Sequence, residues 1–255
     1  MSANIVTALL LTAGAGLATT IGSFIGLAVQ KPGPRFMGFT LGFSAGVMIL
    51  VSFVELLQQS IQSIGFMPAH VGFFTGMITY FLIDTLVPHE YVGEGHPTPQ
   101  RSGSDNLMRT GLLVALGIGI HNFPEGMATF VGALKDVRLG TAIAVAIAVH
   151  NIPEGVAVSV PVYLATGSRK KAFLWSFLSG VSEPLGAALA ALFLMPFLTV
   201  QVFGYVLASV AGIMTAISID ELIPAAKAYG SKRMPMLGLM AGMLIMALSL
   251  HLLGS

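Results

Sequence analysis

The residues HNFPEG at 121–126 return almost unchanged as HNIPEG at 150–155, each time in the middle of an apolar segment. In each copy the histidine and the glutamate are four positions apart, so both side chains fall on one face of a helix. The asparagine is three positions from the same glutamate and reaches it from the other side. The repeat therefore predicts two halves of one metal site, with the candidate ligands His121, Asn122, Glu125, His150, Asn151 and Glu154.

Each copy also contains a proline between the asparagine and the glutamate. Pro124 has no N–H group, so the carbonyl of Ile120 loses its helical partner, and Pro153 does the same to the carbonyl of Val149. Proline also kinks a helix. A freed carbonyl beside polar side chains is a common way to make room for an ion within a membrane helix.

A third acidic residue, Glu183 in SEPLG, lies near the middle of the next apolar segment. A charged group near the centre of a bilayer costs about 2.5 kcal/mol or more. Consecutive helices run antiparallel, so the two motif copies are expected to be related by a pseudo-twofold axis in the membrane plane. This arrangement is typical of transporters with inverted symmetry and a binding site at the midplane.

The candidate ligands are two imidazoles, three carboxylates and two amides, and the chain has no cysteine. Such a nitrogen and oxygen set suits Zn²⁺ and also Fe²⁺, Mn²⁺ or Co²⁺, and it does not rank these ions or Cd²⁺. Three glutamates around one divalent ion leave a net charge near −1. A second ion sharing Glu125 and Glu154 brings that charge to about +1, which makes a two-metal site a reasonable hypothesis.

The composition indicates the environment of this site. Hydrophobic residues make up 55% of the chain and charged residues only 9%, against about 25% charged residues in an ordinary soluble domain. The mean hydropathy is +0.86. The net charge of +1 gives no indication of a nucleic-acid partner. These values predict an all-α polytopic membrane protein whose surroundings are the lipid bilayer.

Eight apolar segments are long enough to cross the bilayer as helices, and together they form one transmembrane domain over residues 1–255. The predicted helices are 4–29, 36–57, 68–88, 108–133, 139–164, 172–195, 200–222 and 234–253. Most connections are short, so consecutive helices are expected to be antiparallel neighbours. The exception is the polar stretch 89–106, which is rich in Gly and Pro and is expected to form a cytoplasmic loop.

The basic residues orient the chain. Eight crossings place both termini on one side. The other side carries ten Lys and Arg residues, namely Lys31, Arg35, Arg101, Arg109, Arg169, Lys170, Lys171, Lys227, Lys232 and Arg233. Only Lys135 and Arg138 fall on the same side as the termini. The positive-inside rule makes the ten-residue face cytoplasmic, so both termini are expected outside the cytoplasmic (inner) membrane. A homodimer is compatible with the sequence.

Six further residues form a predicted ion pathway, with ordinary packing or helix-end roles as the alternative: Met48, Ser52, Glu55, Asp84, His89 and Asp220. The first three share a helical face near the outer end of the second segment. The other three lie at the cytoplasmic ends of the third and seventh segments or in the polar loop, where carboxylates and imidazole could receive exiting metal.

The chain resembles the ZIP (Zrt-, Irt-like protein) family of divalent metal transporters, and most closely its bacterial, GufA-like branch. The resemblance rests on HNFPEG, HNIPEG and SEP and extends over all eight segments. It implies metal uptake into the cytosol through a binuclear centre whose primary site is His121, Glu125, His150 and Glu154. It implies an adjacent site of Asn122, Asn151 and Glu183, with Glu125 and Glu154 bridging. It also implies an elevator-like shift of helices 1, 4, 5 and 6 against the other four.

Two other classes of protein could use the same ligands. A membrane-embedded metalloenzyme is one, but zinc proteases carry H-E-x-x-H, and di-iron bundles carry Glu-x-x-His with four contributing helices. Here the order is His-x-x-x-Glu. A metal-sensing scaffold is the other, but no signalling domain is recognisable. The sequence contains no phosphate-binding loop of the kind that ATP-driven pumps use, so ATP-driven transport is not expected. The sequence therefore favours a secondary transporter, not an enzyme.

Overall fold

The computed structural model describes residues 2–29, 33–86, 103–229 and 232–253, with the side chains of some residues in the helix that begins at Gly103 left out. Every element in this part of the chain is helical. The helices are α1 (Ser2–Ala28), α2 (Pro34–Val51), α3 (Leu57–Ile64), α4 (Phe66–Leu86), α5 (Gly103–Lys135), α6 (Val137–Thr166), α7 (Arg169–Leu189), α8 (Val200–Ile217), α9 (Ile223–Ala228) and α10 (Met234–Leu253).

Three of the long segments contain a π-helical turn. Helix α2 continues through η1 (Ser52–Leu56) into α3, and α8 continues through η4 (Ser218–Leu222) into α9. Helix α7 continues through η2 (Ala190–Leu194) into the short 3₁₀ helix η3 (Met195–Phe197). Seven segments of the described chain are long and apolar enough to cross a membrane, and α5 is an eighth long helix. The prediction of an all-helical, multi-pass membrane protein is confirmed.

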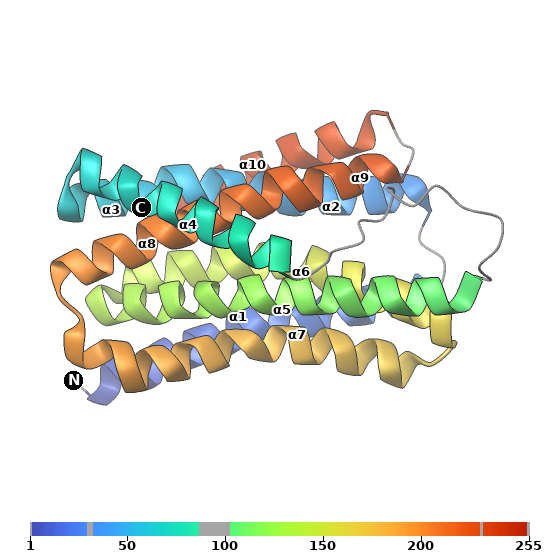
Figure 1. Cartoon of the computed structure of the whole chain (residues 1–255), viewed down its shortest axis with the longest axis horizontal. Helices are drawn as coiled ribbons and strands as arrows, with labels where there is room; N and C mark the ends of the chain where they lie inside the picture. Colours follow the sequence, from blue (N-terminus) through green and yellow to red (C-terminus); the bar gives the residue numbers. More distant parts are fainter. Residues whose placement is uncertain (1, 30–32, 87–102, 230–231, 254–255) are drawn as a thin grey trace.

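The helices form two groups (Figure 1). Helix α1 packs against α5, α6 and α7, and these four form the motif group. In the second group, α2 packs against α10 and α9, and α4 packs against α8. The groups meet mainly where α2 contacts α6 and where α5 contacts α8. The expectation that consecutive helices are neighbours is therefore wrong for α1 and α2 and for α7 and α8, because the members of each pair belong to different groups.

Close approach between backbones joins the helix pairs of the second group. A Cβ built at Gly42 or Gly46 of α2 would lie 2.2 or 2.1 Å from a carbonyl oxygen of α10, and one at Gly76 of α4 would lie 2.0 Å from a carbonyl oxygen of α8. Only glycine allows such contacts. The glycine spacing therefore serves helix packing, which is the role expected of small residues at membrane helix interfaces.

Both ends of the described chain lie at the left in Figure 1, where α1 begins and α10 ends. The described basic residues are divided between the two ends of the bundle. Lys135 and Arg138 lie where α5 ends and α6 begins, at the same end as the termini. The starts of α2, α7 and α10 and the end of α9 lie towards the right in Figure 1. Seven described basic residues lie at or beside these helix ends, namely Arg35, Arg169, Lys170, Lys171, Lys227, Lys232 and Arg233. The charge asymmetry expected from the sequence is thus present in the fold.

Several predicted boundaries need correction. Helix α5 begins at Gly103, so the last residues of the predicted loop 89–106 are helical. The second segment extends past 57 to Ile64, where Gly65 at φ 88° turns the chain into α4. The seventh extends past 222 to Ala228, because a π-helical turn bridges α8 and α9 without breaking the helix. Residues in polar helix ends carry too little hydropathy signal to mark these limits.

The tight connection between α5 and α6 is stabilised by an N-cap. The Asp136 carboxylate accepts hydrogen bonds from the backbone N–H groups of Arg138 (2.7 Å) and Leu139 (3.0 Å). Replacing Asp136 by Ala should cost about 1 kcal/mol, because both N–H groups lose their partner. In a chain of this size that lowers the apparent melting temperature by about 2–4 °C. Asp136→Asn, which keeps a capping oxygen, should melt close to wild type in the same thermal scan.

Candidate metal centre

Both motif copies lie in the middle of long helices of the motif group. In α5, Asn122 is fully buried and Glu125 is 1% exposed. In α6, His150, Asn151 and Glu154 are all fully buried. The backbone of His121 belongs to α5, but its side chain lies outside the described residues. The sequence-predicted ligands that the structure describes are therefore shielded from solvent, as a midplane site requires.

Glu183 joins the two copies from α7. Its side chain is fully buried, and its carboxylate interacts electrostatically with those of Glu125 and Glu154. Helix α7 packs against both α5 and α6. Three acidic side chains from three helices thus gather in the interior of one helix group, which is unfavourable without a compensating positive charge.

Hydrogen bonds connect the copies across the helices. His150 Nε2 lies 3.3 Å from Glu125 Oε2, so the imidazole of one copy contacts the carboxylate of the other. Asn151 donates through Nδ2 to the Ala15 carbonyl of α1 (2.9 Å) and to the Glu183 carboxylate. Asn122 donates through Nδ2 to the Ser179 carbonyl of α7 at 3.4 Å. Both asparagines therefore use their N–H donors on neighbouring helices and keep their oxygens for another partner.

Four buried oxygens in this cluster accept no hydrogen bond within the described part of the chain: Asn122 Oδ1, Glu125 Oε1, Asn151 Oδ1 and Glu183 Oε2. A buried oxygen without a donor costs free energy. A divalent cation is a suitable partner for such oxygens, since amide and carboxylate oxygens are ordinary ligands of these ions. Among the described side chains, no three His, Asp or Glu residues already converge into a metal cage.

The glycine that ends each motif copy has a role that the sequence did not reveal. A Cβ at Gly126 would lie 2.0 Å from the Glu183 carbonyl of α7, and one at Gly155 would lie 1.9 Å from the Thr19 carbonyl of α1. Helices α5 and α6 can approach these neighbours so closely only because both positions are glycine. The recurrence of Gly directly after Glu in both copies was the signal for this role.

The predicted pathway residues do not belong to this cluster. Met48 and Ser52 are fully buried, and the Ser52 hydroxyl donates to the Met48 carbonyl (2.7 Å). Glu55 is 4% exposed and lies in the π-helical turn η1. Asp84 is half-buried near the end of α4, and His89 lies outside the described residues. Asp220 is exposed and accepts a hydrogen bond from Tyr80 (3.1 Å).

A second internal repeat contains four of these residues, Met48, Ser52, Glu55 and Asp220. The pattern Met-x-x-x-Ser-x-x-Glu-Leu occurs at 48–56 and again at 214–222. Both copies end in a π-helical turn, and in both the serine hydroxyl donates to the methionine carbonyl at 2.7 Å. Turn η1 lies against α8 and turn η4 lies against α2. The repeat places Glu55 and Glu221 in equivalent turns. This repeat was not detected from sequence alone, because only four of its nine positions are identical and most of the others are ordinary apolar residues.

Comparison with known proteins gives a consistent result. The sequence model of the family described as "ZIP Zinc transporter" matches residues 93–250. A zinc transporter ZupT of Lysinibacillus sphaericus is 50% identical over 268 residues, covering 99% of this chain and 100% of that protein. A zinc transporter ZupT of Chlorobium phaeovibrioides is 54% identical over 259 residues, covering 96% of this chain and 97% of that protein.

These relatives are named as transporters and not as enzymes, so the metalloenzyme alternative is not favoured. The similarity to these transporters extends over nearly the full length of the chain. The structure is consistent with it, because the paired motif lies buried among packed membrane helices. The chain belongs to the ZIP family of zinc transporters.

Proposed function

We propose that this protein carries zinc across the cytoplasmic membrane into the cytosol through the cluster formed by α5, α6 and α7. The four buried oxygens without hydrogen-bond donors are the observation that carries the proposal. Three of them lie on side chains of the repeated motif and the fourth belongs to Glu183, and zinc is the ion named in the relatives. The ligands His121, Asn122, Glu125, His150, Asn151, Glu154 and Glu183 constitute the proposed site.

We infer further that the site holds two metal ions. One divalent ion does not balance the three carboxylates of Glu125, Glu154 and Glu183, whereas two ions do so with a small positive excess. The His150–Glu125 contact joins the two motif copies, so a carboxylate at that position is placed to bridge. The mixed nitrogen and oxygen set also accommodates Fe²⁺, Mn²⁺, Co²⁺ and Cd²⁺, which we propose as competing substrates.

The distribution of basic residues supports a proposed orientation of the chain in the membrane. The seven described basic residues at the right-hand end in Figure 1 favour a cytoplasmic location for that end. Both termini then lie outside. With this orientation α2 runs towards the outer side and ends in η1, which contains Glu55, and α8 runs towards the cytoplasmic side and ends in η4, which contains Asp220 and Glu221. We propose that the two π-helical turns line the entry and the exit of the pathway.

A kinetic prediction tests the entry role of Glu55. One carboxylate oxygen of this buried side chain, Oε1, has no hydrogen-bond partner within the described residues. Glu55→Gln should raise the zinc concentration that gives half-maximal uptake severalfold, while the maximal rate stays near wild type, because the transport site itself is unchanged. Gln58→Ala, at an exposed position in the next turn, should change neither value. An unaltered half-maximal concentration in Glu55→Gln would exclude Glu55 from the entry.

Transport itself is tested in proteoliposomes that contain the purified chain and a trapped fluorescent zinc indicator. Zinc added outside should enter at a saturable rate that grows with the amount of protein and falls when Mn²⁺ or Cd²⁺ competes. Vesicles without protein provide the baseline. Uptake no faster than this baseline, with correctly folded protein in the vesicles, would contradict the proposed function.

A further inference from the structure

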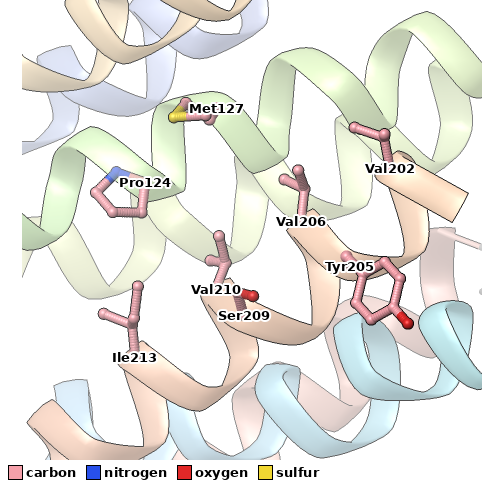
Figure 2. Close-up of a pocket in the computed structure, with 8 residues that line it drawn as sticks. All are labelled: Pro124, Met127, Val202, Tyr205, Val206, Ser209, Val210 and Ile213. Atoms are coloured by element: carbon pink, nitrogen blue, oxygen red, sulfur yellow. The ribbon is translucent and has the colours of Figure 1, made fainter. Parts of the chain in front are cut away.

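An apolar groove lies between α5 and α8, at the boundary between the motif group and the second group. Figure 2 shows Pro124 and Met127 on α5 opposite Val206, Val210 and Ile213 on α8. The groove has a volume of about 350 Å³. None of the proposed metal ligands lines it, although Pro124 belongs to the first motif copy. It is therefore a feature separate from the transport site.

The depth of the groove matches one leaflet of a bilayer. Its lining runs along α8 from Val202 to Ile213, a helical length of about 16 Å at 1.5 Å per residue. One half of the hydrocarbon core is about 15 Å thick. The groove begins near the outer end of α8 and ends beside Pro124, in the middle of α5. An occupant of this length reaches from the membrane surface to the midplane.

The volume of the groove distinguishes between occupants. A single carbon chain about 4 Å wide and about 16 Å long occupies about 200 Å³, which a groove of about 350 Å³ can hold. The same length of an α-helix about 10 Å across fills about 1,200 Å³. A helix from a second copy of this chain is therefore too large, whereas one acyl chain fits.

A positive charge lies at the outer end of the groove. The Lys135 Nζ atom is 4.1 Å from the ring centroid of Phe203, which follows the lining residue Val202, and it donates to Ser63 Oγ (3.1 Å). The ammonium group has three N–H donors, and this side chain is exposed. The nearby Asp136 carboxylate caps α6, and Arg138 is exposed beside it. An anionic phosphate can therefore bind at Lys135 at the level of the headgroups.

We propose that this groove binds one phospholipid of the outer leaflet, with an acyl chain between α5 and α8 and the phosphate on Lys135. The acyl chain then fills the boundary between the two helix groups down to Pro124. This inference depends on the fold, on the charge at Lys135 and, for the choice of leaflet, on the orientation proposed above, and it stands or falls independently of the transported ion.

A tryptophan reporter tests the proposal on the purified full-length chain in detergent. Trp175, the single tryptophan, is replaced by Phe, and the exposed groove residue Tyr205 is replaced by Trp. The matched control carries Phe193→Trp instead, an exposed position in η2 at the same end of the bundle. Phosphatidylglycerol with brominated acyl chains, which quench tryptophan, is then added in small amounts. Quenching of Tyr205→Trp should saturate near one lipid per chain, whereas quenching of Phe193→Trp should rise only with the lipid fraction of the micelle.

Two further variants in the reporter chain separate the acyl-chain contact from the phosphate contact. Lys135→Gln should raise the half-saturating lipid concentration about tenfold, since a charged hydrogen bond is lost. Val206→Phe, at a half-buried position that faces α5 in Figure 2, should fill the groove and remove the saturable phase while the melting temperature stays near that of the reporter. Parallel quenching curves for Tyr205→Trp and Phe193→Trp would overturn the proposal. So would a reporter that no lipid quenches in a chain that migrates as a dimer, since a second copy would then cover the groove.

Discussion

Glu125→Gln should reduce the rate of zinc uptake into proteoliposomes by more than about 100-fold, because groups that only support metal ligands already contribute 10–100-fold. The substitution keeps the shape of the side chain and removes its charge. Glu125 Oε2 contacts His150 of the other motif copy, and Oε1 has no partner within the described residues, so both oxygens are placed for metal. The glutamine amide is neutral, so the variant also lacks the negative charge that a bridging carboxylate supplies.

The control for this experiment is one turn further along α5. Thr129 is fully buried, and its hydroxyl also has no hydrogen-bond partner in the described structure. Thr129→Val removes the hydroxyl group, nearly preserves the size of the side chain and leaves every proposed ligand in place, so this variant should transport near the wild-type rate. Glu125→Asp, which keeps the charge on a shorter side chain, should retain partial uptake. If Glu125→Gln and Thr129→Val transport equally well, Glu125 is not a ligand.

Gly22→Ala should lower the stability of the protein by about 3 kcal/mol, the upper part of the range for overpacked interiors. A Cβ at Gly22 would lie 1.9 Å from the Ile152 carbonyl oxygen in the second motif copy. Backbone atoms cannot give way as a flexible side chain does, so α1 and α6 must move apart. The apparent melting temperature should fall by about 6–12 °C, and zinc uptake should fall with it, because Ile152 lies between Asn151 and Pro153.

Gly14→Ala on the same helix is the matched control. No described atom lies within 4 Å of a Cβ at Gly14. The exchange should leave the melting temperature unchanged or raise it slightly, because Ala is favoured over Gly in a helix by about 1 kcal/mol. Equal melting temperatures for Gly22→Ala and Gly14→Ala would show that the close approach of α1 and α6 does not hold the motif in place.

Much of the site could be predicted from sequence, because the free-energy cost of a polar residue in a membrane helix depends on that helix alone and not on the rest of the fold. Polar residues in an apolar helix are expensive wherever the helix packs, so an exact repeat of His-Asn-x-Pro-Glu pointed to a shared site before any fold was known. The burial of Glu125, His150 and Glu154 agrees with this prediction. The metal-binding role of these residues stays a prediction, as do the bridging role of Glu154 and the elevator-like shift.

Other features depend on contacts between distant segments, which hydropathy does not encode. The packing of α1 against α6 rather than α2 follows from Gly22 and Gly155 meeting backbone on the opposite helix. The use of both asparagine N–H groups on neighbouring helices depends on where the carbonyls of Ala15 and Ser179 lie. The π-helical turns that contain Glu55 and Glu221 could not be predicted from sequence, because their residues have the same hydropathy pattern as an ordinary α-helix.

The most direct test of the proposed centre is zinc bound at equilibrium to purified protein, measured by dialysis against radioactive zinc. Wild type should saturate at two equivalents per chain, and the double variant Glu125→Gln/Glu154→Gln should bind none in the same concentration range, with an unchanged helical circular dichroism spectrum. A double variant that binds as much zinc as wild type would contradict a transport site built from the two motif copies.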